Sequence, residues 1–338
     1  MLPELNISTY LADPTAKRAL EFINQLRETC HGSGFFYLTG HGVSEQANQA
    51  TIAIANQFFD LPLSEREAIA IGRSAGFRGY TLLKNERTNG RVDWRDQLDV
   101  GPEEPAPRLS PHDPPWQRLR GPNQWPASLP AMSTTINSWM AQMQPVGLAL
   151  MRALAVGLGK EADFFDSRMA PDPYTRVKII RYPSQPEEGG SGQGLGLHND
   201  SGLITMILQD SIPGLQVMSD GKLVDVECRP GTFVVNLGEM IQAATNGYLR
   251  ATAHQVVSPP PGKQRISIAY FINPRLDACF DPIELPAVLA EQASGTQNAD
   301  SSNPVYASYG TNTLKTRMRS HPDVTARFYS DVQLAGVD

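Results

Sequence analysis

The spacing of apolar side chains predicts helices in the first half of the chain. Apolar residues recur every three or four positions over 19–30, 52–59 and 132–154, which is the period of an amphipathic helix. Ser44 precedes the second of these segments and is a suitable N-cap, because its hydroxyl can accept a hydrogen bond from a free backbone amide. Pro145 lies inside the third segment and is expected to kink or break that helix, since proline has no amide hydrogen to donate.

After residue 171 the pattern changes to short apolar and β-branched runs separated by Gly, Pro, Asn and Asp. Many short strands at such spacing are typical of a β-sandwich or barrel. We therefore expect a mainly β protein with flanking helices. Its regions would be an N-terminal helical and mixed region over 1–130 and one integrated unit over 131–338, with the β core at about 172–284. The predicted strands are 177–182, 203–208, 214–218, 222–225, 232–237, 254–257 and 265–272.

Composition narrows the class of protein. The chain has 338 residues, of which 41% are hydrophobic and 19% charged, values that are typical of a folded globular protein. The net charge of -6 and the absence of a basic stripe argue against nucleic acid or an anionic membrane as the main partner. No signal-like N-terminus and no apolar run of the ~20 residues needed to span a bilayer is present, so we expect a cytoplasmic monomer or weak homo-oligomer.

Two candidate metal ligands stand two residues apart in the segment His198-Asn199-Asp200. In an extended strand, side chains at positions i and i+2 point to the same face, so this imidazole and carboxylate are expected to converge. His254 opens a later predicted strand and offers a third ligand. Two histidines and one carboxylate form the facial triad that leaves positions on iron open for oxygenase chemistry. Zinc, which binds three or four such ligands, is the alternative that ligand softness leaves open.

The strand predicted over 265–272 carries a candidate acid-binding site. Alternation places Arg265 and Ser267 on one face of this strand, beside Ala269 and Phe271. A guanidinium binds a carboxylate through two parallel hydrogen bonds, and a serine hydroxyl can add a third. A carboxylate anchor near a metal site suggests a keto acid as cosubstrate.

With these residues the sequence resembles the iron(II)- and 2-oxoglutarate-dependent dioxygenases of the isopenicillin N synthase-like type. The similarity covers most of the chain. It is carried by the segments Gly34-Phe35-Phe36-Tyr37-Leu38, His198-Asn199-Asp200-Ser201-Gly202-Leu203-Ile204-Thr205, Gly214-Leu215-Gln216-Val217, Gly231-Thr232-Phe233-Val234-Val235-Asn236, His254-Gln255-Val256 and Arg265-Ile266-Ser267.

This resemblance implies a fold, a set of cofactors and roles for the site residues. The fold would be a double-stranded β-helix, a cupin-like jelly roll, with helices packed around it. His198, Asp200 and His254 would hold Fe(II), and Arg265, Ser267 and Tyr182 would bind 2-oxoglutarate. The implied reaction consumes O2 and 2-oxoglutarate, releases succinate and CO2, and hydroxylates a small organic molecule; desaturation and ring closure are related outcomes.

Three further residues are candidate substrate contacts. Lys178 shares a strand face with Tyr182, and Phe271 shares a face with Arg265. Glu86 lies in a region that often contributes to the substrate pocket in similar proteins. Together they favour a small polar or zwitterionic substrate.

Two other functions remain open at this point. One is an isopenicillin N synthase-like oxidase, which uses iron and O2 without 2-oxoglutarate. The other is a cupin-like binding or sensor protein without catalysis. An intact triad beside an intact Arg-x-Ser motif argues against the sensor, because a protein that only binds has no need of open positions on iron.

Overall fold

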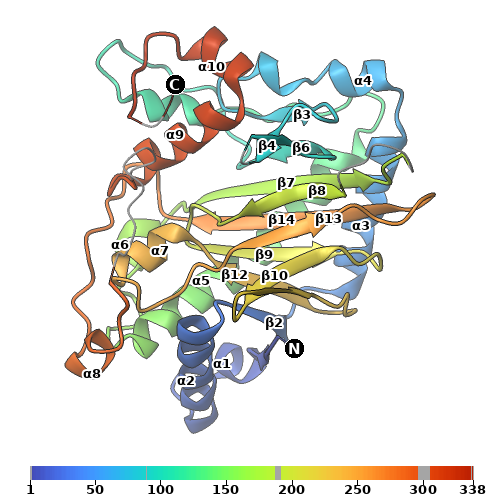
Figure 1. Ribbon diagram of the computed structural model, residues 1–338. Coiled ribbons are helices and arrows are strands. Elements are labelled where there is room, and N and C mark those ends of the chain that lie inside the picture. The colour runs from blue at the N-terminus through green and yellow to red at the C-terminus, as the bar shows by residue number, and fades with distance from the viewer. Residues whose placement is uncertain (1, 89, 187–191, 296–304, 336, 338) are drawn as a thin grey trace.

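Two β-sheets form the centre of the computed structural model, which describes residues 2–88, 90–186, 192–295, 305–335 and 337 (Figure 1). The larger sheet has the strand order β1 (Glu4–Asn6), β2 (Phe35–Thr39), β12 (Phe233–Leu237), β9 (Ile204–Gln209), β14 (Gln264–Asn273), β7 (Tyr174–Pro183), β6 (Asp96–Val100) and β3 (Gly79–Thr81). The smaller sheet has the order β11 (Lys222–Asp225), β10 (Leu215–Ser219), β13 (His254–Val257) and β8 (Gln193–His198). The two strands β4 (Arg87–Thr88) and β5 (Arg91–Val92) pair separately. The expected mainly β architecture with two facing sheets is confirmed.

Each of the seven strands predicted from the sequence is present, with ends that agree to within three residues. Alternation along these strands directs one set of apolar side chains into the space between the sheets. That set joins the large sheet to the small one and consists of Phe35, Tyr37, Ile180, Tyr182, Leu195, Ile207, Leu215, Val217, Val226, Val234, Val256 and Ala269. Burial of these side chains fixes the register of β7 and β14, because a slip of one residue would turn each set to the opposite face.

Three long helices cover the other face of the large sheet: α2 (Lys17–Gly32), α3 (Glu45–Asp60) and α5 (Ala131–Gly157). Ser44 caps α3 as predicted, since its side chain accepts a hydrogen bond from the Ala47 amide. Trp139 of α5 packs edge-on against Phe233 and Tyr270 of the sheet.

Pro145 was expected to kink or break a helix, and the structure excludes the break. Helix α5 continues from Ala131 to Gly157 with Pro145 inside it. A proline in a helix costs about 3 kcal/mol. Apolar side chains on both sides of it, among them Met143 and Leu150, are fully buried, and each such side chain contributes roughly 1.5–3 kcal/mol. Burial on both sides therefore outweighs the lost hydrogen bond.

Shorter elements complete the molecule. These are α1 (Ser8–Ala12), α4 (Leu63–Glu67), α6 (Asp166–Met169), α7 (Glu239–Ala244), α8 (Ala287–Ala290), α9 (Tyr309–Ser320) and α10 (Pro322–Phe328), with 3-10 turns at Ile71–Arg73 and Pro115–Leu119. Helices α1 and α2 lie at one end of the stack of strands, and α9 and α10 lie at the other (Figure 1). Within the described residues, no helix has the length and apolar content that crossing a membrane requires.

Candidate metal centre and active-site cavity

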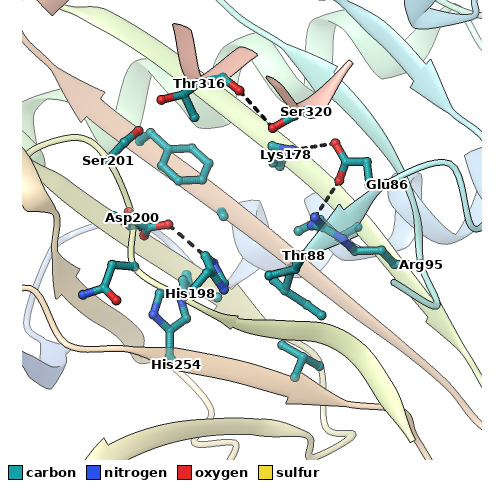
Figure 2. Close-up of a pocket in the computed structure, with 18 of the residues that line it drawn as sticks. Glu86, Thr88, Arg95, Lys178, His198, Asp200, Ser201, His254, Thr316 and Ser320 are labelled. Atoms are coloured by element: carbon teal, nitrogen blue, oxygen red, sulfur yellow. Dashed lines mark hydrogen bonds and ion pairs between the residues drawn. The ribbon is translucent and has the colours of Figure 1, made fainter. Parts of the chain in front are cut away.

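A cavity of about 480 Å³ lies between the two sheets. Side chains of β7 and β14 line it from the large sheet, and those of β8 and β13 line it from the small sheet. Helix α9 and the β4 hairpin close the side opposite the histidines, with Thr316 and Ser320 on the helix and Thr88 on the hairpin (Figure 2). A bound molecule would therefore contact residues from both sheets, from the β4 hairpin and from α9.

The structure brings together the three candidate metal ligands. His198 ends β8, His254 begins β13, and the two residues pair directly across these antiparallel strands. Nitrogen or oxygen atoms of His198, His254 and Asp200 all lie within 4.8 Å of one another. Asp200 does not share the strand with His198, as the sequence suggested, because β8 ends at His198. Its carboxylate nevertheless turns toward the same point, with 3.8 Å between His198 Nε2 and Asp200 Oδ1 (Figure 2).

Hydrogen bonds to the far side of each ligand orient it. Nδ1 of His198 lies 2.9 Å from the Gly196 carbonyl, and Nδ1 of His254 lies 3.2 Å from the Thr252 carbonyl. A carbonyl can only accept, so each Nδ1 carries the proton and each Nε2 has a free lone pair.

The carboxylate of Asp200 is held in the same manner. Its Oδ2 accepts hydrogen bonds from the Thr205 hydroxyl at 2.5 Å and from the Asn236 amide at 2.8 Å. Oδ1 is left toward the two histidines. Such outer hydrogen bonds are the usual means of fixing metal ligands.

The protonation states of these residues suit a cation. Burial, followed by the nearby His254, lowers the pKa of His198 to about 3, so its ring is neutral at neutral pH. Burial by itself would raise the pKa of Asp200, but it is not the only influence on that carboxyl. The charges of His254 and His198 and the hydrogen bonds from Asn236 and Thr205 outweigh burial and lower that pKa below its usual value. Two histidines and one carboxylate are the donor set of an iron facial triad, so the residues fit the metal that the sequence suggests.

Arg265 lies in the same cavity with most of its donors unused. It is 1% exposed, and its Nη2 donates a hydrogen bond to Gln209 Oε1 at 2.7 Å. Its Nε and Nη1 atoms are buried and have no partner among the described residues. A buried guanidinium with free donors is costly unless an anion binds to it. Ser267 and Tyr182 line the cavity beside it, as alternation predicts, and the Tyr182 ring lies 5.3 Å from the guanidinium carbon. These residues fit a carboxylate of 2-oxoglutarate.

Comparison with known proteins shows the family. Residues 174–274 match the 2OG-Fe(II) oxygenase superfamily, and residues 2–128 match the N-terminal region described as non-haem dioxygenase in morphine synthesis. The 2-oxoglutarate-dependent dioxygenase frbJ of Dothideomycetidae sp. (strain 11243) is 34% identical over 333 residues, which cover 94% of this chain and 89% of that protein. The chain belongs to the 2-oxoglutarate- and iron(II)-dependent oxygenases. It is an oxidoreductase that uses Fe(II) and 2-oxoglutarate to oxidise an organic substrate.

Other members of this oxygenase family show different substrates on a similar chain. Homoarginine-6-hydroxylase 2-ODD-233 of Oryza sativa subsp. japonica is 31% identical over 271 residues, covering 78% of this chain and 81% of that protein. A full-length Neurospora crassa protein, crystallised in complex with alpha-KG and 5-formyluracil, has a TM-score of 0.72 and 26% identity, covering 86% of this chain and 90% of that one. The jelly-roll fold expected for this oxygenase is thereby confirmed.

The three candidate substrate residues all line the cavity, but they differ in the contacts that they already make with the protein. Lys178 lies on the same face of β7 as Tyr182, and Phe271 lies on the same face of β14 as Arg265. Glu86 lies just before β4 and is buried. Its carboxylate already has cationic partners, so its role as a substrate contact stays a prediction.

Sequence reasoning missed the cluster of charges around Glu86. Its carboxylate lies 2.5 Å from Arg95 Nη2 and 3.5 Å from Lys178 Nζ (Figure 2). It also lies 3.1 Å from His321 Nε2. Asp99 extends the cluster through Lys178 at 3.8 Å and Arg317 at 3.0 Å. The partners come from β6, β7 and α9 and from the loop before β6, so no local pattern indicates them.

This cluster yields a prediction about stability. Burial alone raises the pKa of Glu86, but Lys178, Arg95 and His321 outweigh it and hold that pKa well below its usual value. Glu86→Gln removes the anion between buried cations and should lower the free energy of unfolding at pH 7 by roughly 2–4 kcal/mol. Because the folded pKa is depressed, the stabilisation exists above the usual glutamate pKa and fades as the pH falls. Urea unfolding at pH 7 and in mild acid measures both effects.

The control for this experiment is Glu21→Gln, exposed on α2, which should change stability by less than ~0.5 kcal/mol. Equal stability of wild type and Glu86→Gln at pH 7 would show that the cluster does not stabilise the fold.

Proposed function

We propose that this oxygenase hydroxylates a C–H bond of a small polar organic molecule, with release of succinate and CO2. The observation that carries the proposal is the shared cavity, in which the candidate metal ligands face a polar wall made by Lys178, Glu86 and α9. The cavity is concave and of modest volume, which favours a free small molecule over a nucleic acid. All of these residues come from one chain, so a monomer is sufficient for the reaction.

His198, Asp200 and His254 would hold Fe(II) through the two Nε2 atoms and Oδ1. When bound, iron would activate O2, which is the oxidant of the reaction: O2 takes up two electrons from 2-oxoglutarate, which is decarboxylated to succinate, and two from the substrate, which is oxidised. The three protein ligands would leave other positions on the metal open to small molecules. The hydrogen bonds that Asp200 accepts keep its carboxylate in one orientation while these molecules exchange.

Arg265 would bind the distal carboxylate of 2-oxoglutarate through its two free donors, with Ser267 and Tyr182 completing the site. Burial raises the pKa of Tyr182, so its hydroxyl stays protonated and can donate a hydrogen bond. The free Nε and Nη1 atoms of Arg265 suit this carboxylate but do not by themselves separate it from a substrate carboxylate. The match to 2-oxoglutarate-dependent relatives is what disfavours the cosubstrate-free oxidase.

The wall opposite the metal would orient the substrate. Phe271 contributes an apolar surface, and Lys178 and Glu86 contribute charge, on the side closed by α9. This wall would present one C–H bond to the metal and exclude water, the usual contribution of the protein in cofactor chemistry. Hydroxylation is the outcome when oxygen is transferred to the carbon of this C–H bond. Desaturation and ring closure are the competing outcomes.

Anaerobic reconstitution tests the proposed function. Purified protein with Fe(II) and 2-oxoglutarate should develop a metal-to-ligand charge-transfer band. Admission of O2 with a panel of metabolites should then produce succinate in step with one oxidised substrate. If no band forms and no 2-oxoglutarate is consumed, the proposal fails; a band without any accelerating metabolite supports the binding or sensor alternative.

A further inference from the structure

Cations outnumber carboxylates around the cavity. Among the described lining residues, the carboxylates are Glu86, Asp200 and Glu239, and the cations are Arg87, Arg95, Arg176, Lys178, Arg265, Arg317 and Arg319. A surplus of positive charge in a concave site raises the local concentration of anions and selects for them. The question is which of these cations is free to bind a ligand.

Three of the cations are already neutralised by protein carboxylates. Arg95 pairs with Glu86 and with Asp93 at 3.3 Å, Lys178 pairs with Glu86, and Arg317 pairs with Asp99 at 3.0 Å. Arg265 has the free donors assigned above to 2-oxoglutarate. This leaves Arg176 within the cavity, besides Arg87 and the exposed Arg319 at its edge.

Arg176 faces the cavity without a carboxylate partner among the described residues. It alternates with Lys178 and Tyr182 along β7, and so lies on the same face of that strand. Its guanidinium carbon lies 4.9 Å from the ring centre of Phe271, its neighbour across β14. Its Nε atom is buried and has no hydrogen-bond partner in the part of the chain that the structure describes.

The surroundings of Arg176 do not compensate its charge. Burial first, and then the positive charge of Arg176, lower the pKa of Arg317, while Asp99 opposes the shift. The guanidiniums of Arg176 and Arg317 therefore repel each other. Among the described residues, only Arg317 of the two has a carboxylate partner. An arginine that is partly desolvated, held against an aromatic ring and left with free donors is suited to an incoming anion.

From this arrangement we infer that Arg176 binds a carboxylate of the substrate, in a subsite between β7, Phe271 and α9 that is separate from the 2-oxoglutarate anchor at Arg265. The inference rests on the proposed function and specifies its substrate class: a small organic acid or an amino acid. Arg319 at the edge would attract the acid toward the cavity.

The charges favour a carboxylate over a phosphate. A single free guanidinium matches a carboxylate through two parallel hydrogen bonds. A phosphate carries nearly two negative charges at neutral pH and three acceptor oxygens. Asp200 and Glu239 line the same cavity and would oppose the second charge.

The test is a binding measurement that does not need turnover. Wild-type protein loaded with Zn(II), which is redox-inert, and 2-oxoglutarate is titrated by ligand-observed NMR. The probes are the common amino acids and a set of aliphatic and aromatic monocarboxylic acids, each with its primary amide, and phosphate monoesters of similar size. We expect at least one acid to bind and its amide to bind at least about tenfold more weakly.

Variants assign the effect to Arg176. Arg176→Gln should weaken binding of that acid at least about tenfold, and Arg176→Lys should retain part of the affinity. The matched control is Arg27→Gln, since Arg27 on α2 also has a buried Nε without a partner among the described residues but lies outside the cavity; it should bind the acid as the wild type does. The Fe(II) and 2-oxoglutarate charge-transfer band, recorded on each variant, reports that the variant is folded.

Four outcomes overturn the inference: equal binding of acids and amides, binding of phosphates alone, no binding by any acid, or an Arg176→Gln variant that binds acids like the wild type. Each of them is compatible with a normal charge-transfer band in the wild type, which would leave the proposed function standing. Absence of that band in the wild type is instead a failure of the proposed function.

Discussion

Replacing His198 with alanine is expected to lower iron-dependent turnover by at least about 1,000-fold. A catalytic metal contributes several kcal/mol to the reaction, and each 1.36 kcal/mol is a factor of ten in rate. His198→Ala removes one of the three atoms that converge within 4.8 Å and leaves Asp200 and His254 as an incomplete pair. Succinate formation with Fe(II) in excess, together with the iron content of the purified variant, measures both the rate and the occupancy.

A second histidine provides the control for this experiment. His31 is also partly buried, and its Nδ1 also lies against a carbonyl, that of Tyr248 at 2.7 Å, but it is located on α2. His31→Ala should keep iron binding and turnover within a few-fold of wild type. Retained turnover in His198→Ala would mean that the metal site has been misplaced. Equal losses in both variants would indicate damage to the fold rather than loss of a ligand.

The sequence was sufficient where side-chain direction follows from strand alternation. Strand β14 is paired on both sides, with β7 and β9, so its register is fixed and Arg265, Ser267 and Phe271 all reach the cavity. His254 was expected to supply a third ligand together with His198, and the structure pairs these two residues directly on adjacent strands. A pattern with a period of two thus predicted the strands and the positions of Arg265, Ser267 and Phe271, but not that of Asp200, which lies beyond the end of β8.

The sequence was insufficient where charges from distant elements meet. Glu86, Arg95 and His321 form one buried cluster, yet they lie before β4, before β6 and after α9. Nothing in the local sequence distinguishes such a charge from one on a solvated surface, because its burial depends on packing between segments far apart. The same limit hid Arg176, whose significance lies in the absence of a partner among the described residues.

The second large effect is expected at Arg265. Arg265→Met removes the guanidinium whose Nε and Nη1 are free, while it keeps much of the side-chain volume. Loss of one partner of a buried, hydrogen-bonded charge pair costs about 2–5 kcal/mol, so the apparent affinity for 2-oxoglutarate should fall by roughly 30-fold or more. Titration of the charge-transfer band with 2-oxoglutarate measures this change. An effect confined to the prime substrate would instead favour the oxidase that needs no 2-oxoglutarate.

The free energy of unfolding should not fall with 2-oxoglutarate affinity in Arg265→Met. Without 2-oxoglutarate, Arg265 is a buried cation with two unused donors, so Arg265→Met should change the free energy of unfolding by no more than about 1 kcal/mol, or increase it. The matched control is Arg181 on β7, which donates two hydrogen bonds to Asp96, at 2.9 and 2.7 Å, and one to the Phe59 carbonyl at 3.2 Å. Arg181→Met should lower stability by about 2 kcal/mol or more and leave 2-oxoglutarate affinity unchanged. The comparison therefore distinguishes Arg181, which stabilises the fold, from Arg265, which is positioned to bind a ligand. A large loss of stability in cofactor-free Arg265→Met would contradict that assignment.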